Sequence, residues 1–504
     1  MSATIMVQGT SSSVGKSVIA AGLCRIFLQD GMSVAPFKGQ NMSNNSFVTP
    51  EGAEIGRAQA MQAAACRIPP SSAMNPVLLK PEADHRSQVV LNGKATGSLN
   101  SKEWRNKKPE LWDAVAAGLE KLRGEYDVVV IEGAGSPAEV NLRASDITNM
   151  RVAVHANSPV LLVGDIDRGG VFASLLGTLE LLEPKERKLV RGLIINRFRG
   201  DRAVLEPLPA MIEERTGVSV LGVVPYFTDI ALPEEDAVAL DHRVDRQADD
   251  GDLIVAVVRF PRVSNFDDFD PLERTPGVHV RFIDSPHELI GVHLIVLPGT
   301  KSTISDLRWM RERGLDSAVI AATNRGVPVI GICGGYQMLG ETITDASGVD
   351  LPAGGSESGL GLLSVQTAFE SVKSTRQVHF KMNGGPGLLA GASGIEGVGY
   401  EIHMGVTSPV EGACPQTTQY MRHGTDLERS GAVNADGNVL GTYVHGLFDT
   451  AEVRSAILAN VTSAAGIPPL VGVDDYSLDT ELDKLADHLR VSLDMSAIYG
   501  MIGR

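Results

Sequence analysis

Short apolar runs alternate with helix-length segments along most of this 504-residue chain. Parallel strands covered on both faces read as continuous apolar runs, and each pair of strands needs a crossover connection, usually a helix. The pattern therefore predicts an α/β fold with two doubly wound domains. The runs are residues 4–7, 127–131, 159–163, 192–195 and 218–224, followed by 253–258, 293–297 and 327–332.

Charged side chains interrupt this rhythm over residues 240–252. Because 504 residues exceed what one hydrophobic core organises, we expect a domain over residues 1–240, a linker over 241–252 and a second domain over 253–504. The second domain is expected to end in a helical tail that packs against the protein itself. The apolar stripe of this tail is Leu482, Leu485, Leu489 and Leu493, with charges of both signs between them.

Bulk composition excludes several classes of protein. The net charge of −16 argues against a general nucleic-acid binder, which would present a basic face. The four cysteines lack metal-ligand spacing and are too few to crosslink a chain of this length, which favours a reducing compartment. No apolar stretch is long enough to cross a bilayer. We expect a cytoplasmic enzyme that acts without nucleic acid or membrane, and its oligomeric state stays open.

A glycine- and serine-rich loop follows the first apolar run and precedes a helix-like segment. This context predicts a phosphate-binding loop in which Lys16 bridges phosphates and the Ser17 hydroxyl binds Mg²⁺. Five residues separate the two loop glycines, one more than in the common motif, and a simple turn that caps the helix is the alternative. The predicted ATP-binding residues are Gly9, Thr10, Ser11, Ser12, Ser13, Val14, Gly15, Lys16 and Ser17.

Three polar residues follow other apolar runs, at the sheet edge where ligands of open parallel sheets collect. Glu132 and Asp165 are candidate magnesium ligands beside Ser17. Asn196 is a candidate for reading adenine through its amide group. Capping of a helix or formation of a turn is the competing role for the two carboxylates, and formation of a turn is the competing role for Asn196.

Cys333 lies in Gly-Ile-Cys-Gly-Gly, between an apolar run and a helix-like segment. A side chain presented at such a tight turn needs strained backbone angles and neighbours without Cβ atoms, which predicts a nucleophile. The N–H groups of Gly299 and Gly334 are the expected oxyanion donors. A buried core cysteine and an ordinary β-turn at residues 297–300 are the alternatives.

A thiol nucleophile needs a base, and His445 is the preferred candidate because it follows the strand-like residues 439–444. His403 is its rival.

Residues 331–340 resemble the nucleophile segment of class I glutamine amidotransferases. The first half, with its long loop and the segment 130–135, is similar to the dethiobiotin synthetase group of P-loop proteins. Together the two halves resemble the cobyric acid synthase family. Further segments that carry the resemblance are residues 38–46, 164–170, 196–201, 264–270 and 400–405.

This resemblance implies an ATP- and glutamine-dependent ligase of cobalamin biosynthesis. Such enzymes amidate the b, d, e and g carboxylates of adenosylcobyrinic acid a,c-diamide to give adenosylcobyric acid. The implied cofactors are ATP and Mg²⁺, and the implied partners are glutamine and a corrinoid polycarboxylate. ATP would activate a carboxylate as an acyl phosphate, and ammonia released from glutamine by Cys333 and His445 would displace the phosphate.

The sequence departs from the amidotransferase pattern at Leu447, where a glutamate usually follows the catalytic histidine by two residues. We therefore expect a Cys333/His445 dyad, with Glu401 as a candidate helper. Lys38, Asn41 and Asn44 form a candidate substrate loop; the two asparagines stand where related a,c-diamide synthases are acidic.

Three alternatives stay open. Cobyrinic acid a,c-diamide synthase shares both halves, and CTP synthase joins a similar pair of domains for a nucleotide substrate. A ParA- or MinD-like ATPase switch shares only the first half and leaves Cys333 without a role.

Overall fold

The computed structural model describes residues 2–83, 86–233, 248–249, 251–350, 354–413, 415–423, 426–472 and 476–504. It divides into two compact units. Unit 1 comprises Met1–Ser43, Ala53–Pro233 and Tyr476–Arg504, and unit 2 comprises Asn44–Gly52 and Glu234–Asp475. The expected division differs at two places, because residues 44–52 belong to unit 2 and the C-terminal tail belongs to unit 1. Most of the expected linker lies outside the described residues.

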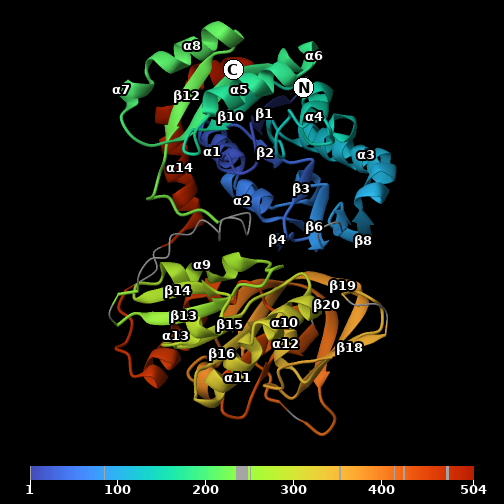
Figure 1. Cartoon of the computed structure of the whole chain (residues 1–504), viewed down its shortest axis with the longest axis vertical. Coiled ribbons are helices and arrows are strands. Elements are labelled where there is room, and N and C mark those ends of the chain that lie inside the picture. Colours follow the sequence, from blue (N-terminus) through green and yellow to red (C-terminus); the bar gives the residue numbers. More distant parts are fainter. Residues whose placement is uncertain are drawn as a thin grey trace. The chain divides into compact units, whose positions relative to one another are not determined.

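Unit 1 is built on a six-stranded parallel sheet in the order β12-β11-β10-β1-β9-β2, as the apolar runs predict (Figure 1). The central strand β1 has its last six residues buried, as expected for a strand covered on both faces. The strands are β1 (Ala3–Gly9), β2 (Val34–Phe37), β9 (Val128–Glu132), β10 (Val160–Asp165), β11 (Val190–Phe198) and β12 (Val220–Pro225).

A smaller sheet, β3-β6-β7-β8, accompanies the main sheet of unit 1 and does not follow from the apolar-run pattern. Its strands are β3 (Gln40–Met42), β6 (Val77–Ala83), β7 (Arg86–Leu91) and β8 (Lys94–Asn100), and β5 (Glu54–Gly56) is a further short strand. The helices of unit 1 are α1 (Lys16–Gln29), α2 (Arg57–Ala65), α3 (Ser101–Glu125), α4 (Met150–Ala156), α5 (Val171–Leu181), α6 (Pro184–Arg187), α7 (Arg202–Leu205), α8 (Pro207–Thr216), α14 (Leu478–Ser492) and α15 (Met495–Met501).

The C-terminal helix α14 packs on α1, the helix that follows the glycine-rich loop (Figure 1). The four leucines of its stripe are all buried, which confirms that the stripe packs against the protein itself. Gly22 of α1 permits this close approach, because a Cβ there would overlap the Leu489 side chain. Arg25 of α1 is fully buried and pairs with Asp479 at 2.6 Å.

Unit 2 contains a second doubly wound sheet in the order β14-β13-β15-β16-β24-β23. All neighbours are parallel except β23, which is antiparallel to β24. The strands are β13 (Leu253–Val258), β14 (Val278–Ile283), β15 (Leu294–Leu297), β16 (Val329–Ile332), β23 (Ala432–Val433) and β24 (Val439–Thr442). The helices are α9 (Asp270–Arg274), α10 (Thr303–Glu312), α11 (Leu315–Asn324), α12 (Gly334–Leu339) and α13 (Ala451–Ala465).

A mainly antiparallel sheet completes unit 2, in the order β18-β17-β19-β21-β22 with β20 also paired to β19. Its strands are β17 (Thr342–Asp345), β18 (Gly355–Ser358), β19 (Val365–Met382), β20 (Glu396–Pro409), β21 (Gln419–His423) and β22 (Asp426–Ser430). The short strand β4 (Ser46–Val48) also belongs to this unit.

Candidate functional site

The glycine-rich loop of unit 1 joins the end of β1 at Gly9 to the start of α1 at Lys16. Ser13 and Gly15 adopt positive φ angles of 58° and 95°, which turn the chain sharply before the helix. The loop closes on itself, since a Cβ on Gly9 would lie 2.5 Å from Val14 Cγ2. This geometry places backbone N–H groups at a helix N-terminus, the usual setting for a phosphate.

Lys16 folds back over this loop and is 6 % exposed. Its Nζ donates to the Ser11 carbonyl oxygen at 2.8 Å and to the Gly135 carbonyl oxygen at 3.1 Å. The ammonium group therefore lies between the loop and the segment that follows β9, where it can meet a bound phosphate.

Glu132, at the end of β9, is the centre of a buried polar cluster. Its Oε1 accepts hydrogen bonds from Ser17 Oγ at 2.8 Å and from Lys38 Nζ at 2.8 Å. Its Oε2 accepts a hydrogen bond from Gln62 Nε2 at 2.6 Å. The structure thus brings together Ser17 and Glu132, two of the three predicted metal ligands, and adds Gln62, which the sequence analysis missed.

The oxygen donors of Ser17 and Glu132 fit Mg²⁺, which proteins commonly hold through one or two side chains together with phosphate oxygens and water. Among the residues that the structure describes, no group of three or more His, Cys, Asp or Glu side chains is arranged to bind a metal. An ion at this place would therefore be shared with a nucleotide.

Asp165 and Asn196 are engaged in local contacts. Asp165 pairs with Arg197 at 3.0 Å and accepts a hydrogen bond from the Asp167 N–H at 2.9 Å. Asn196 donates from Nδ2 to the Val14 carbonyl oxygen at 2.8 Å. The Asn196 amide thus braces the glycine-rich loop, and its predicted contact with adenine stays a prediction.

The candidate substrate loop divides between the two units. Lys38 lies in unit 1 against Glu132. Asn41 also lies in unit 1, where it donates to Gln59 Oε1 at 3.0 Å and is 3 % exposed. Asn44 belongs to unit 2. The buried Asn41 amide is therefore held by protein groups.

In unit 2, Cys333 stands at the corner between β16 and α12, with φ 52° and ψ −108°. A non-glycine residue in this region is strained, and such strain collects at functional sites. The corner also depends on its glycines: a Cβ on Gly335 would overlap the Leu297 carbonyl oxygen, and one on Gly331 would lie 2.5 Å from Leu339 Cδ1.

His445 and Asp268 form a buried pair beside Cys333, with 2.7 Å between His445 Nδ1 and Asp268 Oδ2. Asp268 Oδ1 also accepts a hydrogen bond from the Gly446 N–H at 2.8 Å. Burial lowers the pKa of His445, but the Asp268 carboxylate and the Cys333 sulfur outweigh it and raise this pKa to about 10. Cys333, His445 and Asp268 are therefore arranged as a triad with a protonated imidazole at neutral pH.

The third member of this triad differs from the expected helper, Glu401. Glu401 pairs instead with Arg376, with 2.7 Å between Arg376 Nε and Glu401 Oε2. The rival base His403 stacks on Tyr443 at 3.8 Å between ring centroids. Asp268 lies in the segment 264–270, which carries the family resemblance. Because positions 267 and 270 are also aspartate, the sequence does not indicate which of the three carboxylates reaches the histidine.

The two predicted oxyanion donors approach the triad. The Cβ position of Gly299 is 3.0 Å from His445 Cε1, and that of Gly334 is 3.2 Å from the Thr300 nitrogen. Gly334 is the first residue of α12, so its N–H has no acceptor within the helix. Cys333 Sγ lies 3.4 Å from the Ile402 carbonyl oxygen. Glycine at these positions thus permits the close approach of the 299–300 turn to His445 and to the start of α12.

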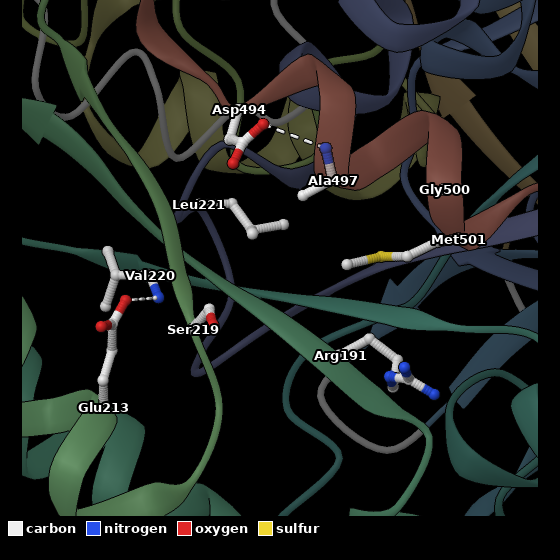
Figure 2. Close-up of a pocket in the computed structure, with 9 residues that line it drawn as sticks. All are labelled: Arg191, Glu213, Ser219, Val220, Leu221, Asp494, Ala497, Gly500 and Met501. Atoms are coloured by element: carbon white, nitrogen blue, oxygen red, sulfur yellow. Dashed lines mark hydrogen bonds between the residues drawn. The ribbon is translucent and has the colours of Figure 1, made fainter. Parts of the chain in front are cut away.

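A separate cavity of about 450 Å³ in unit 1 is lined by residues of β11, α8, β12 and α15 (Figure 2). Its two carboxylates accept hydrogen bonds from backbone N–H groups, Glu213 from Val220 and Asp494 from Ala497. None of the predicted site residues lines it.

Among the residues that the structure describes, no helix is long and apolar enough to cross a membrane.

Comparison with known proteins matches both units to families. Residues 5–238 match the CobQ/CobB/MinD/ParA nucleotide binding domain, and residues 254–453 match the CobB/CobQ-like glutamine amidotransferase domain. The amidotransferase match spans Asp268, Cys333 and His445.

Full-length relatives agree with this domain pair. The chain is 48% identical over 506 residues to the cobyric acid synthase of Dehalococcoides mccartyi (strain CBDB1), covering 100% of this chain and 99% of the relative. It is 50% identical to that of Sorangium cellulosum (strain So ce56) and 48% identical to that of Salmonella typhimurium (strain LT2), each covering 99% of this chain and 98% of the relative.

Proposed function

The chain belongs to the cobyric acid synthase family, and we propose that it uses ATP and glutamine to amidate the b, d, e and g carboxylates of adenosylcobyrinic acid a,c-diamide. The observation that carries the proposal is one chain that holds both a phosphate loop with Glu132 beside Ser17 and a Cys333–His445–Asp268 triad. The first site suits activation of an acid by ATP, and the second suits release of ammonia from an amide.

At the triad, the Cys333 thiolate attacks the side-chain amide carbon of glutamine. The carbonyl oxygen becomes an oxyanion, which the N–H groups of Gly299 and Gly334 stabilise. His445, protonated at neutral pH, gives its proton to the nitrogen as the carbon–nitrogen bond breaks, and ammonia leaves. Water then hydrolyses the thioester with neutral His445 as the base, which releases glutamate and restores the thiolate–imidazolium pair.

At the phosphate loop, backbone N–H groups and Lys16 bind the phosphates of ATP and offset the charge that develops during transfer. Ser17 and Glu132 would hold Mg²⁺, which supplies charge neutralisation at the transferred phosphate. The carboxylate of the corrinoid attacks the γ-phosphorus and ADP leaves. Ammonia then displaces phosphate from the acyl phosphate to give the amide.

Mass spectrometry of reaction products tests this function. The purified chain is supplied with ATP, Mg²⁺, glutamine and, in separate reactions, cobyrinic acid and its adenosylated a,c-diamide. We expect conversion of four carboxylates of the a,c-diamide to amides. Amidation only at the a and c positions of cobyrinic acid would instead assign the chain the activity of an a,c-diamide synthase. Amidation of neither corrinoid would contradict the proposal.

A further inference from the structure

Residues 44–52 belong to unit 2, whereas the chain on either side of them belongs to unit 1. We call Asn44–Gly52 the docking segment. Its residues have no part in the glutaminase chemistry described above, yet three of its contacts lead to the three members of the triad. This pattern points to a role in positioning.

The first contact leads to Asp268. Asn45 Oδ1 accepts a hydrogen bond from the Asn265 N–H at 2.7 Å, and Asn265 Oδ1 accepts one from the Ser46 N–H at 3.0 Å. Asn265 has a left-handed backbone with φ 52°, and its carbonyl oxygen accepts the Asp268 N–H at 3.1 Å. This reciprocal pair therefore fixes the turn that presents the Asp268 carboxylate to the imidazole.

The second contact leads to His445. The Phe47 ring lies 5.4 Å from the Tyr400 ring, measured between centroids. The Tyr400 ring in turn stacks on the His445 imidazole at 5.2 Å and 17°. The backbones of Tyr400 and His445 also exchange two hydrogen bonds, of 3.1 and 2.9 Å. A shift of the Phe47 ring would therefore move the Tyr400 ring and change the orientation of the His445 imidazole.

The third contact leads to Cys333. Val48 is fully buried in a small cluster with Tyr400 and Ile402. The Val48 carbonyl oxygen accepts a hydrogen bond from Gln377 Nε2 at 2.9 Å, which fixes the strand in place. The Ile402 carbonyl oxygen is the group 3.4 Å from Cys333 Sγ. The docking segment therefore supports the strand that lies against the nucleophile.

We propose that the docking segment positions the glutaminase triad. It holds the turn that carries Asp268, the ring that stacks on His445 and the strand that lies against Cys333. The inference rests on the proposed function, since it assigns positioning residues to that same glutaminase.

Two substitutions test the positioning role in the nucleotide-free protein. Asn265→Gly keeps the left-handed backbone and removes only the side chain that accepts from Ser46. Phe47→Ala removes the ring that contacts Tyr400. The matched control is Asn460→Ala, which removes an amide that donates to backbone oxygens elsewhere in unit 2. The measurements are kcat/KM for glutamine as a function of pH and the rate at which a chloroketone analogue of glutamine alkylates Cys333, mapped by peptide mass spectrometry.

Both test variants are expected to lose roughly tenfold in kcat/KM and in alkylation rate, the effect of about 1.4 kcal/mol in a transition state. In Asn265→Gly the alkaline limb of the pH profile should also move to lower pH, because a less firmly held Asp268 stabilises the imidazolium less. Amidation from added ammonium should persist in both. Behaviour of both variants like Asn460→Ala would overturn the positioning role.

Amidation by the wild-type protein separates this inference from the proposed function. A wild-type protein that hydrolyses glutamine but amidates no corrinoid would contradict the proposed function, whatever the two test variants show.

Discussion

At the scale of single residues, the triad depends on a carboxylate that motif reading could not identify. The usual glutamate position is Leu447, and the nearest alternative in the sequence, Glu401, is used by Arg376. Asp268 reaches His445 because the turn after β13 and the residues after β24 both lie at the carboxyl ends of the parallel strands. Sequence patterns locate the ends of such strands, but which of several aspartates reaches the imidazole depends on the backbone of the turn.

Asp268→Asn tests this assignment. Without the carboxylate, the pKa of His445 falls from about 10 toward its ordinary value, so the imidazolium is lost at lower pH. We expect kcat/KM for glutamine hydrolysis to fall roughly a hundredfold or more, and its alkaline limb to move to lower pH. The control is Glu396→Gln, which removes an exposed carboxylate of unit 2. An unshifted alkaline limb would argue against the triad.

Glu132→Gln tests the metal site. The amide cannot match the carboxylate as a ligand of Mg²⁺ or as the counter-charge of Lys38. We expect amidation to be lost with glutamine and with ammonium alike, together with the Mg²⁺ dependence of ATP binding measured by calorimetry. Glutamine hydrolysis without ATP should remain. The control Glu186→Gln removes a buried carboxylate that caps α6 and should leave ATP binding intact. Full amidation by Glu132→Gln would refute the assignment.

At the scale of elements, the parallel strands were the part of the fold that the sequence could predict. A buried parallel strand is apolar at every position, and residues 253–258 match β13 at both ends. The antiparallel strand β19 has buried, exposed and half-buried residues along its 18 positions, so it presents no continuous run. The mainly antiparallel sheet of unit 2 was missed for this reason.

The elbow between β16 and α12 requires glycine at position 335 for a steric reason. A Cβ there would overlap the Leu297 carbonyl oxygen, so Gly335→Ala must displace the elbow or β15. We expect this variant to lose glutamine hydrolysis while ammonium-dependent amidation persists. The control is Gly177→Ala, because a Cβ on Gly177 meets no atom within 4 Å. Normal glutamine hydrolysis in Gly335→Ala would show that the corner tolerates a side chain.

Helix α14 stabilises the phosphate-loop helix α1 by burying its leucine stripe. Leu485→Ala should lower the free energy of unfolding of unit 1 by about 2–5 kcal/mol, the usual effect of emptying a packed core position. Val491→Ala on the same helix should change it by less than about 0.5 kcal/mol, because Val491 is 84% exposed. The free energy of unfolding of both variants is measured by urea titration, with the loss of ATP binding as the signal. Equal stability of the two variants would mean that α14 contributes little to the unit.

At the scale of the whole molecule, the order of the chain and its division into units do not coincide. Residues 44–52 belong to unit 2, although the residues on both sides of them belong to unit 1. Residues 476–504 belong to unit 1, although the residues before them belong to unit 2. The apolar period of the tail predicts that it packs, but an amphipathic stripe carries no information about which core receives it. The segment 44–52 is too short to show any period. The unit to which each of these segments belongs is decided by tertiary contacts, which neither composition nor hydrophobic periodicity predicts.

The two chemistries of the chain should nevertheless separate when each site is disabled. Cys333→Ala removes the nucleophile and leaves Lys16 and Glu132 untouched, so it should abolish glutamine-dependent amidation and retain amidation from added ammonium. Lys16→Ala removes the cation that binds phosphate, so it should stop amidation with either nitrogen source and retain glutamine hydrolysis. Product amides and glutamate are measured in parallel for both variants. Loss of ammonium-dependent amidation in a folded Cys333→Ala protein would mean that the sulfur also serves the ligase reaction, and the division between the two sites would fail.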